Sequence, residues 1–338
     1  MKVAVFGASG YTGGELLRLL VNHPAEVVVA TSKEYVGKPI YLVHPHLKGF
    51  YSMKFSSLEE ALDKDYDYAF IALPHGLSKD LVPELLESGV KIVDLGADFR
   101  LKDPSLYEKW YGFTHPYPDL LEKAVYGLPE LNREEIRKAE LVASPGCNAT
   151  ATILASAPLV KMGASHLIAD LKVGSSEAGS KPGKGTHHPN REGAIRPYSP
   201  SGHRHQAEAQ QELSKLAGRE VKVSLIPHSV SSVRGAFASV HTFLKADEME
   251  LWKAYAKFYS GEPFVRVTQR GTVPNVKSVI GSNFADVGFA SDQESDRVTG
   301  FAAIDNLIKG AAGQAIQSLN LMAGLDERTG LTIPPLSP

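Results

Sequence analysis

The run Lys2-Val-Ala-Val-Phe6, the loop Gly7-Ala-Ser-Gly-Tyr-Thr-Gly-Gly14 and the segment Glu15-Leu-Leu-Arg-Leu-Leu20 decide the fold. The first is a short apolar run typical of a buried strand, and the leucines of the third suit the buried face of a helix. A second buried strand follows at Val27-Val-Val-Ala30. Strand, glycine loop, helix and strand together have the length of a βαβ unit that binds a dinucleotide.

The glycines of this loop indicate an anion site. Gly7, Gly10 and Gly13 would let the backbone approach a pyrophosphate at the helix N-terminus, where free N–H groups and the helix dipole favour anions. Their spacing departs from the commonest G-x-G-x-x-G pattern. A tight strand–helix turn that binds nothing therefore stays an alternative.

The end of the second strand indicates which dinucleotide binds. NAD-binding folds usually carry an acid there for the ribose 2′-hydroxyl, but this chain reads Ala30-Thr-Ser-Lys33. Because Thr31, Ser32 and Lys33 offer hydroxyls and a cation to a 2′-phosphate, we expect NADP(H) as the cofactor. The alternative is a turn whose lysine points into water.

Further strands and helices alternate in the first half of the chain. Apolar runs indicate strands at 68–73, 91–94 and 141–143, and a helical pattern lies at 79–88. This alternation predicts a doubly wound parallel sheet, whose ligands lie at the carboxyl ends of the strands. The loops that follow those ends are Pro74-His-Gly76, Gly96-Ala-Asp-Phe-Arg100 and Ser144-Pro-Gly-Cys-Asn148.

Two residues of these loops are candidates for ligand contact. Pro74 stands at the cofactor edge of the predicted sheet. Arg100 is a candidate for binding a substrate phosphate, because a guanidinium binds phosphate through two hydrogen bonds. A structural ion pair of Arg100 with Asp94 or Asp98 is the alternative.

Cys147 is the only cysteine, which excludes internal disulfides and multi-cysteine metal sites. It follows a strand and Pro145-Gly146 and precedes an apolar helical segment at 151–157, so we expect it at a helix N-terminus. The dipole and free amides there stabilise a thiolate. With Asn148, the same amides could receive the oxyanion that forms when a thiolate attacks a carbonyl carbon. We predict a nucleophile, and the alternative is a small buried hydrophobe.

A thiolate together with a dinucleotide site restricts the chemistry to attack on an activated acyl group and hydride transfer through a thiohemiacetal. An acid/base partner is then required. The segment Gly202-His-Arg-His-Gln-Ala-Glu208 supplies His203 and His205, and we prefer His205 because it lies nearer the predicted helix start. H-x-H with His187 and His188 is an alternative zinc site. No carboxylate stands at a characteristic spacing, so no metal is expected.

The second half of the chain has a different pattern. Runs typical of strands lie at 167–173, 221–226, 235–244 and 284–289, with a helix at 248–259. They predict an antiparallel sheet with one packed and one wet face. A last helix at 305–322 carries apolar residues at helical spacing.

The fold class is therefore α/β plus α+β. We predict an NADP-binding, Rossmann-type parallel-sheet domain over 1–147 and an antiparallel-sheet domain over 148–302. The second would provide catalysis, substrate binding and subunit contact. A C-terminal helix at 303–325 is expected to pack back on the first domain.

The composition is that of an ordinary globular protein of about two domains, with 338 residues, 43% hydrophobic and 22% charged. Basic (36) and acidic (38) residues nearly cancel, which argues against a nucleic-acid protein and a polybasic membrane binder. Every apolar run is far shorter than the ~20 residues of a membrane helix. The amino end leads straight into the glycine loop rather than through a signal peptide. We expect a soluble, cytoplasmic protein.

The assembled features resemble the N-acyl-γ-glutamyl-phosphate reductase family, within the aspartate-semialdehyde-dehydrogenase-like group. The motifs that carry the resemblance span almost the whole chain: GASGYTGGEL (7–16), ALPHG (72–76), DLGADFRL (94–101), YGLPELNREEI (126–136), SPGCNAT (144–150), GHRH (202–205) and AIDNLIKGAAGQA (303–315). The resemblance implies a glyceraldehyde-phosphate-dehydrogenase-like C-terminal domain, with Cys147 as the nucleophile and the acid/base histidine in the H-R-H segment.

The resemblance also implies ligand contacts. The positions that correspond to NADP contacts are Ser9, Gly10, Tyr11, Thr12, Thr31, Ser32, Lys33 and Asn306. Ser175 and Ser176 could assist Arg100 in binding the phosphate of an acyl phosphate, and Arg204 is a further candidate for the substrate.

Two departures from the common arginine-pathway enzymes narrow the resemblance to one branch. Those enzymes carry a GVSGAGR segment where this chain has 174–188, and usually an aromatic residue where it has Asn148. Together with Pro227–Gly235, this looks like the branch whose substrate is a phosphorylated aminoadipate or glutamate side chain. In that branch the amino group of the substrate is attached to a small acidic carrier protein of the LysW type. The branch serves lysine biosynthesis and, in some archaea, arginine biosynthesis.

Local charge agrees with an acidic partner. A stretch of 33 positions holds only Glu177 and Glu192 as acids, and its basic residues are Lys172, Lys181, Lys184, Arg191, Arg196 and Arg204. Such a basic rim could steer an acidic carrier. A glycine-rich mobile lid with solvated lysines is the alternative.

Two other functions stay open. One is reduction of the free, acetylated glutamyl phosphate without a protein carrier. The other, of a different class, is a non-catalytic NADP-sensing protein, which would not need Cys147 at a helix start together with the H-R-H segment. The family resemblance implies a homo-oligomer, a dimer or a tetramer.

Overall fold

The computed structural model describes residues 1–292 and 294–336, which form two compact units. The first unit contains residues 1–145 and 311–332. The second contains residues 146–310 and the tail from Ile333.

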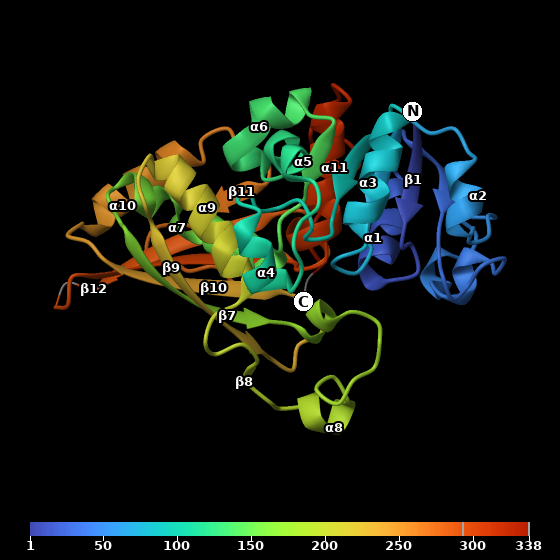
Figure 1. Cartoon of the computed structure of the whole chain (residues 1–338). Helices are drawn as coiled ribbons and strands as arrows, with labels where there is room; N and C mark the ends of the chain where they lie inside the picture. The colour runs from blue at the N-terminus through green and yellow to red at the C-terminus, as the bar shows by residue number, and fades with distance from the viewer. Residues whose placement is uncertain (293, 337–338) are drawn as a thin grey trace. The chain divides into compact units, whose positions relative to one another are not determined.

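The first unit, in which Figure 1 labels β1, α1 and α3, is built on a parallel sheet of six strands in the order β2-β1-β3-β4-β6-β5. The strands are β1 (Lys2–Phe6), β2 (Glu26–Ala30), β3 (Tyr68–Ile71), β4 (Lys91–Asp94), β5 (Val125–Tyr126) and β6 (Leu141–Ala143). The central strands are almost wholly buried, because both faces of a parallel sheet are covered by the crossover segments.

Seven α-helices belong to the described part of the first unit: α1 (Tyr11–Leu20), α2 (Leu58–Leu62), α3 (Ser78–Glu87), α4 (Ser105–Tyr111), α5 (Pro118–Lys123), α6 (Pro129–Lys138) and α11 (Gly313–Met322). Two short 3₁₀ turns, η1 (Ile40–Leu42) and η2 (Pro45–Leu47), lie between β2 and α2. The leucines of α1 are buried, as the sequence pattern predicts for a helix that packs on the sheet.

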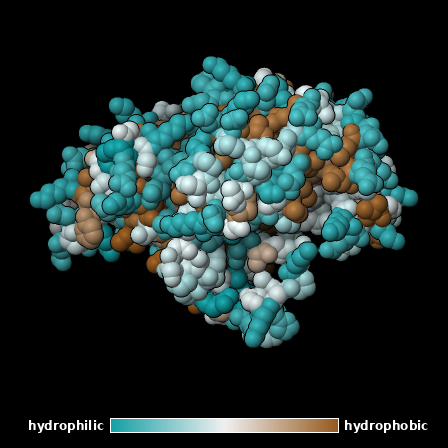
Figure 2. All heavy atoms as spheres, viewed as in Figure 1, coloured by the Kyte–Doolittle hydropathy of each residue, from teal (hydrophilic) through white to brown (hydrophobic). Residues whose placement is uncertain are grey.

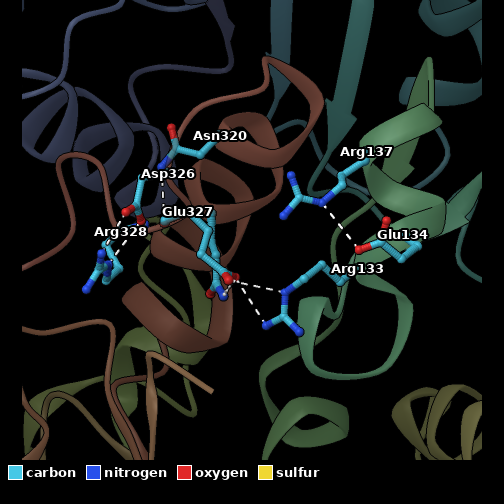
Figure 3. A network of polar contacts seen from close by, with 8 residues as sticks. Arg133, Glu134, Arg137, Asn320, Asp326, Glu327 and Arg328 are labelled. Atoms are coloured by element: carbon cyan, nitrogen blue, oxygen red, sulfur yellow. Dashed lines mark hydrogen bonds and ion pairs between the residues drawn. The ribbon is translucent and has the colours of Figure 1, made fainter. Parts of the chain in front are cut away.

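A polar network joins the C-terminal part of the first unit to α6 (Figure 3). The guanidinium of Arg133 lies 3.2 Å from the carboxylate of Glu327, which also accepts a hydrogen bond from Gln317 (3.0 Å). Asn320 donates through Nδ2 to the backbone oxygen of Glu327 (3.2 Å), and its Oδ1 accepts from Nε2 of His23 (2.7 Å). Helix α11 is thereby held between α6 and the turn that follows α1.

The second unit is built on a seven-stranded sheet in the order β11-β12-β13-β10-β7-β9-β8. The strands are β7 (His166–Val173), β8 (Arg196–Pro197), β9 (Lys222–Ser229), β10 (Ala236–Phe243), β11 (Val265–Val267), β12 (Ala285–Asp292) and β13 (Arg297–Ile304). Neighbours are antiparallel except β7–β9 and β11–β12, which are parallel. The parallel pair β7–β9 follows from the crossover between them, which contains a helix.

Helix α7 (Cys147–Lys161) is the centre of the second unit, and all its residues from Asn148 to Val160 are buried. It packs on β10 and β13 and against α9 (Arg204–Ala217) and α10 (Glu248–Phe258). Shorter elements are η3 (Ser175–Ala178), α8 (His188–Arg191) and η4 (Val276–Ser278). On β7 and β9 every second side chain is buried and the others are partly or fully exposed, so one sheet face is packed and one is open.

The predicted fold class is confirmed, with three differences in detail. The second sheet is mixed rather than purely antiparallel. The predicted C-terminal helix begins later, because residues 303 and 304 end β13 and a π-turn, η5 (Ile308–Ala312), precedes α11. Strand β13 was missed, because its apolar run continues into a segment with helical spacing. Among the described residues, no helix is both long and apolar enough to cross a membrane.

Candidate functional site

The glycine loop of the first unit is built so that two of its glycines are structurally required. Gly7 has a φ of +77°, which favours glycine. A Cβ on Gly13 would lie 2.5 Å from the carbonyl oxygen of Gly7, so the close packing of α1 on the loop needs glycine there. A Cβ on Gly10 would meet only the Gly7 oxygen at 3.7 Å. Nothing within the unit demands glycine at 10, which fits a backbone that a ligand approaches closely.

The N-terminus of α1 fits the same anionic ligand. It has no side-chain cap and no acidic residue in its first turn. Its N-cap is Gly10, and the predicted contact residues Tyr11 and Thr12 open the helix, with Tyr11 45% exposed. These residues could hold a pyrophosphate through backbone N–H groups.

The end of β2 is joined to the glycine loop. Thr31 Oγ1 accepts from the backbone N–H of Gly7 (3.0 Å), and Ser32 Oγ donates to Ser9 Oγ (3.0 Å). Thr31 and Ser32 are buried, whereas Lys33 is exposed beside them. The three residues predicted to meet the 2′-phosphate therefore divide into two hydroxyls that shape the loop and one cation that is open to solvent.

The three strand-end loops of the first unit meet at one edge of the sheet. The carboxylate of Asp98 accepts from Gly76 N (2.7 Å) and Lys79 N (3.0 Å), which ties the Pro74 loop to the loop after β4. Ser144 N donates to the backbone oxygen of Asp94 (2.7 Å). The predicted convergence of these loops is confirmed.

Arg100 and Asp94 are buried at this edge. Arg100 is 5% exposed and donates through Nη2 to the Leu95 oxygen (2.9 Å). Burial raises the pKa of Asp94 to about 7, and Asp98 adds to the rise; bonds from Gly96 and Ser78 and the charge of Arg100 oppose it. Arg100 thus acts within the local structure of the unit, and its contact with a substrate phosphate stays a prediction.

In the second unit, Cys147 is the first residue of α7, as predicted. The helix has Gly146 as its N-cap, with no side-chain cap and no acidic residue in the first turn. Cys147 is partly exposed, and its Sγ lies 3.9 Å from Oδ1 of Asn148. An uncapped helix N-terminus supplies N–H groups that stabilise a thiolate and the oxyanion of an attacked carbonyl.

His205 lies directly against the residue before Cys147. A Cβ on Gly146 would collide with the imidazole of His205, with Cδ2 at 2.5 Å and Cε1 at 2.6 Å. Glu208 stands one helical turn beyond His205 and is fully buried. Its Oε2 accepts from Gly146 N (3.0 Å), and its Oε1 lies 3.9 Å from His205 Nε2. One carboxylate therefore links the backbone next to the thiol with the predicted acid/base residue.

His203 is the N-cap residue of α9. Its Nδ1 accepts from His205 N (3.3 Å), and the two imidazoles pack edge to face with ring centroids 4.4 Å apart. His203 is also in ring contact with Tyr198, whose hydroxyl accepts from Nδ2 of Asn148 (3.1 Å). Burial raises the pKa of Tyr198, so its hydroxyl stays protonated at neutral pH. The geometry agrees with His205 as the acid/base and His203 as its support, an assignment that stays a prediction.

Asn306 and the serine pair belong to the same unit. Asn306 is buried, accepts from Gly235 N (2.7 Å) and donates to Ser176 Oγ (2.9 Å). Ser175 lies at the start of η3, with its N–H bonded to the Ser232 oxygen (2.8 Å). The Asn306 amide is thus engaged within the unit, and its predicted NADP contact stays a prediction.

Only some of the basic residues between 172 and 204 are exposed at the surface. Arg191 is 6% exposed, donates to the Val230 oxygen (2.9 Å) and lies 3.9 Å from Glu177. Lys172 pairs with Asp170 (2.6 Å). Arg191 therefore holds the fold together rather than forming part of a rim, whereas Lys172 is half-exposed and already paired.

The remaining basic residues lie on or near the surface. Lys181, Lys184 and Arg196 are exposed in the loop around α8, where Figure 2 shows a largely hydrophilic surface. Arg204 begins α9 and is half-buried. Burial raises the pKa of Glu177, and the charges of Arg191, Arg204 and Arg196 oppose the rise. Arg204 therefore lies in the same electrostatic environment as Glu177.

No metal centre is visible in the part of the chain that the structure describes. No group of three or more His, Cys, Asp or Glu residues there stands in a metal-binding arrangement. His187 and His188, the other half of the alternative zinc site, are exposed at the N-cap and the first position of α8.

Sequence reasoning assigned no role to three residues around the thiol: Tyr198, Glu208 and Gly310. The spacing H-x-x-E puts Glu208 on the helix face of His205 and could have been noticed. Gly310 packs against Cys147, where a Cβ would lie 2.7 Å from the cysteine Cβ. Residues so distant in sequence give no local signal of such a contact.

Comparison with known proteins identifies relatives of both units. Residues 2–139 match the model of the semialdehyde dehydrogenase NAD binding domain, and residues 147–306 match that of the semialdehyde dehydrogenase dimerisation domain. The LysW-L-2-aminoadipate/LysW-L-glutamate phosphate reductase of Sulfurisphaera tokodaii is 59% identical, over 100% of this chain and 99% of its own. The protein of the same name from Saccharolobus solfataricus is 56% identical over the same shares.

Solved structures share the fold. Aspartate semialdehyde dehydrogenase II of Vibrio cholerae, complexed with ASA, has a TM-score of 0.74 at 18% identity, covering 96% of this chain and 98% of its own. Aspartate semialdehyde dehydrogenase of Candida albicans, with NADP, has a TM-score of 0.71 at 16% identity, covering 95% and 98%. At this identity the likeness concerns the fold alone.

Proposed function

The chain belongs to the semialdehyde-dehydrogenase-like family of LysW-aminoadipate/LysW-glutamate phosphate reductases, which are oxidoreductases. We propose that it catalyses the reductive dephosphorylation of an acyl phosphate. The enzyme reduces a carrier-linked acyl phosphate to a semialdehyde and releases phosphate, in lysine or arginine biosynthesis. NADPH is the reductant. The observation that carries the proposal is the cluster of Cys147, His205 and Glu208 at the uncapped N-terminus of α7.

The first half of the reaction is acyl transfer. The Cys147 thiolate attacks the carbonyl carbon of the acyl phosphate, a C–S bond forms, the C–O bond to phosphate breaks, and inorganic phosphate leaves. The N–H groups at the start of α7, with the amide of Asn148, stabilise the oxyanion. Tyr198 fixes that amide through its hydroxyl. The product of this half is a thioester on Cys147.

The second half is reduction of the thioester. The glycine loop with Thr31, Ser32 and Lys33 would hold NADPH, which would provide the hydride for this step. The resulting thiohemiacetal collapses as its C–S bond breaks, the aldehyde leaves and the sulfur is regenerated. His205 exchanges the proton during this collapse, and the Glu208 carboxylate favours the charged imidazolium.

NAD-binding folds carry an acid at the end of the second strand for the ribose 2′-hydroxyl, but β2 is followed by Thr31, Ser32 and the exposed Lys33. This supports NADPH over NADH as the cofactor. Lys181, Lys184 and Arg196 are exposed cations that an acidic carrier protein could approach. The enzyme is further proposed to be cytoplasmic. It is also proposed to form a homodimer or tetramer through the open face of the second sheet, where Ile168 is 51% exposed.

The test is a substrate comparison with the purified enzyme. Carrier-linked glutamyl phosphate, carrier-linked aminoadipyl phosphate and free acetyl-glutamyl phosphate are assayed side by side for NADPH oxidation. Turnover of a carrier-linked substrate supports the proposal. Activity on the free substrate alone would replace it with the acetylated alternative, and NADPH binding without turnover of any of the three would indicate a sensor.

The same assay separates substrates by length. Because one methylene changes binding by only about 1 kcal/mol, activity on both carrier-linked substrates is compatible with a single pocket. The ratio of their kcat/KM values then decides which pathway the enzyme serves.

A further inference from the structure

Gly310 is in contact with the root of the Cys147 side chain. A Cβ on Gly310 would lie 2.7 Å from Cβ of Cys147 and 3.3 Å from its Cα. These atoms cannot swing away as the tip of a long side chain could. The φ of Gly310 is not positive, so its own backbone conformation does not call for glycine. Among the described residues, the contact with Cys147 is the one that a Cβ at this position cannot tolerate.

Gly310 lies in the π-turn η5, whose start is fixed by the buried carboxylate of Asp305. Oδ2 of Asp305 accepts from Gly281 N (2.9 Å) and lies 3.2 Å from Nη1 of Arg234, and Oδ1 accepts from Leu307 N (2.9 Å). The backbone oxygen of Asp305 accepts from Gly310 N (2.9 Å). The turn is thus bound to two other segments of the unit.

Asn306 adds a second anchor. Its side chain bonds the backbone of Gly235, just before β10, and the hydroxyl of Ser176 in η3. Asp305 and Asn306 together fix the turn at four places outside it. A side chain added at 310 therefore displaces Cys147 rather than the turn.

The other side of Cys147 is equally close. Gly146 leaves room for the imidazole of His205, which a Cβ would fill, and the N–H of Gly146 is held by Glu208. Cys147 thus lies between two close contacts. On one side Gly146 leaves room for His205, and on the other Gly310 leaves room for the Cys147 side chain itself. Inserted π-turns of this kind recur at functional sites.

We propose that Gly310 is a positioning residue: the anchored turn 305–310 fixes the Cα–Cβ direction of Cys147 and so aims its sulfur at the substrate carbonyl. This inference rests on the proposed function, because it concerns the same nucleophile. The contact distance of 2.7 Å lies about 1 Å below an ordinary carbon–carbon contact, so Gly310→Ala moves the thiol by a comparable amount. A misplacement of about 1 Å costs roughly 100-fold in rate.

The experiment compares Gly310→Ala with Gly183→Ala. Gly183 also lacks a positive φ, and a Cβ there meets only Thr186 Oγ1 at 3.7 Å, so its variant is a matched glycine replacement without a clash. Because Cys147 is the only cysteine, iodoacetamide reports on this thiol alone. We expect Gly310→Ala to lower kcat about 100-fold and to change the rate and pH profile of alkylation. KM for NADPH and NADPH binding should stay unchanged. Because Gly183 lies between Lys181 and Lys184 of the proposed carrier site, Gly183→Ala is compared by alkylation alone, and its alkylation of Cys147 should match that of the wild type.

Wild-type kcat and alkylation in a folded Gly310→Ala protein would overturn the proposal. If that variant loses NADPH binding and cooperative melting, Asp305→Asn decides, because it keeps Gly310 and weakens the anchor at Arg234 and Gly281. Loss of kcat with altered alkylation is then expected, and wild-type values for both would overturn the proposal. Failure of the proposed function is seen separately, as turnover that persists in Cys147→Ser.

Discussion

Replacement of Glu208 by glutamine tests the link between the thiol and its acid/base partner. In the wild type one carboxylate oxygen accepts from Gly146 N at 3.0 Å and the other lies 3.9 Å from His205 Nε2. Glutamine keeps the size and one acceptor oxygen. If that oxygen stays on Gly146, the NH₂ group faces His205 and donates to it, which favours the neutral imidazole. The change thus removes the charge while the packing remains.

The magnitude follows from the distance and burial. At 3.9 Å and an effective dielectric constant of about 20, two unit charges interact by about 4 kcal/mol, which is an upper bound. Hydrogen bonds to charged groups contribute about 1.5–3 kcal/mol net, which sets the scale for this pair although its 3.9 Å separation is longer than a hydrogen bond. Since 1.36 kcal/mol is a factor of ten in rate, Glu208→Gln should lower kcat by about 10- to 150-fold. The high-pH limb of the kcat profile should move to lower pH, because the imidazolium loses its counter-charge.

The assay is steady-state NADPH oxidation across pH, with melting curves as a check on folding. Glu212→Gln is the matched control, since Glu212 is buried one turn further along α9 and its carboxylate accepts from Gln211 (2.9 Å). The control should keep the wild-type profile. An unchanged kcat and pH profile in Glu208→Gln would refute the role given to this carboxylate.

Three further predictions concern other parts of the molecule. Gly146→Ala should displace the His205 ring and lower kcat by roughly 100-fold with NADPH binding intact; wild-type kcat would contradict the contact. Asp94 has a pKa raised to about 7 from 3.8, so the folded state holds an extra proton between these values and the melting temperature should fall as pH rises from about 4 to 7. Asp94→Asn should flatten that slope, and an equal slope in both proteins would rule out Asp94 as its source. The KM for carrier-linked substrate should rise with ionic strength if Lys181 and Lys184 steer an acidic carrier, and indifference to salt would remove that role.

The nucleotide-binding half could be predicted in detail because its signals are local. A β-branched run, three glycines and a leucine-rich helix follow one another within twenty residues, and each has the conformation that its own residues favour. The position of Cys147 was predicted for the same reason: Pro145 and Gly146 end a strand, and a helix-forming segment follows.

The second sheet was harder to predict because strand and helix patterns run together there. β13 carries Gly300 in its middle and ends in Ala302-Ala-Ile304, directly before residues with helical spacing. A short apolar run of this kind fits either structure until its neighbours β10 and β12 are known. The parallel pairing of β7 with β9 likewise depends on where α9 packs, which is a tertiary property.

The surroundings of the thiol depend on contacts between distant segments. Gly310 meets Cys147, and Tyr198 meets Asn148, only after the second unit has folded. Arg191 shows that a charged residue in a basic stretch is not always at the surface. Its guanidinium is buried and donates to the Val230 oxygen, a contact that the sequence does not reveal.

The most direct test of the central claim is a single-turnover experiment without reductant. The enzyme is mixed with carrier-linked acyl phosphate in the absence of NADPH, and released phosphate and intact mass are measured. The account predicts about one phosphate released per active site and an acyl adduct on Cys147 that disappears when NADPH is added. Phosphate release that requires NADPH, or an unmodified Cys147 after the burst, would contradict a covalent thioester.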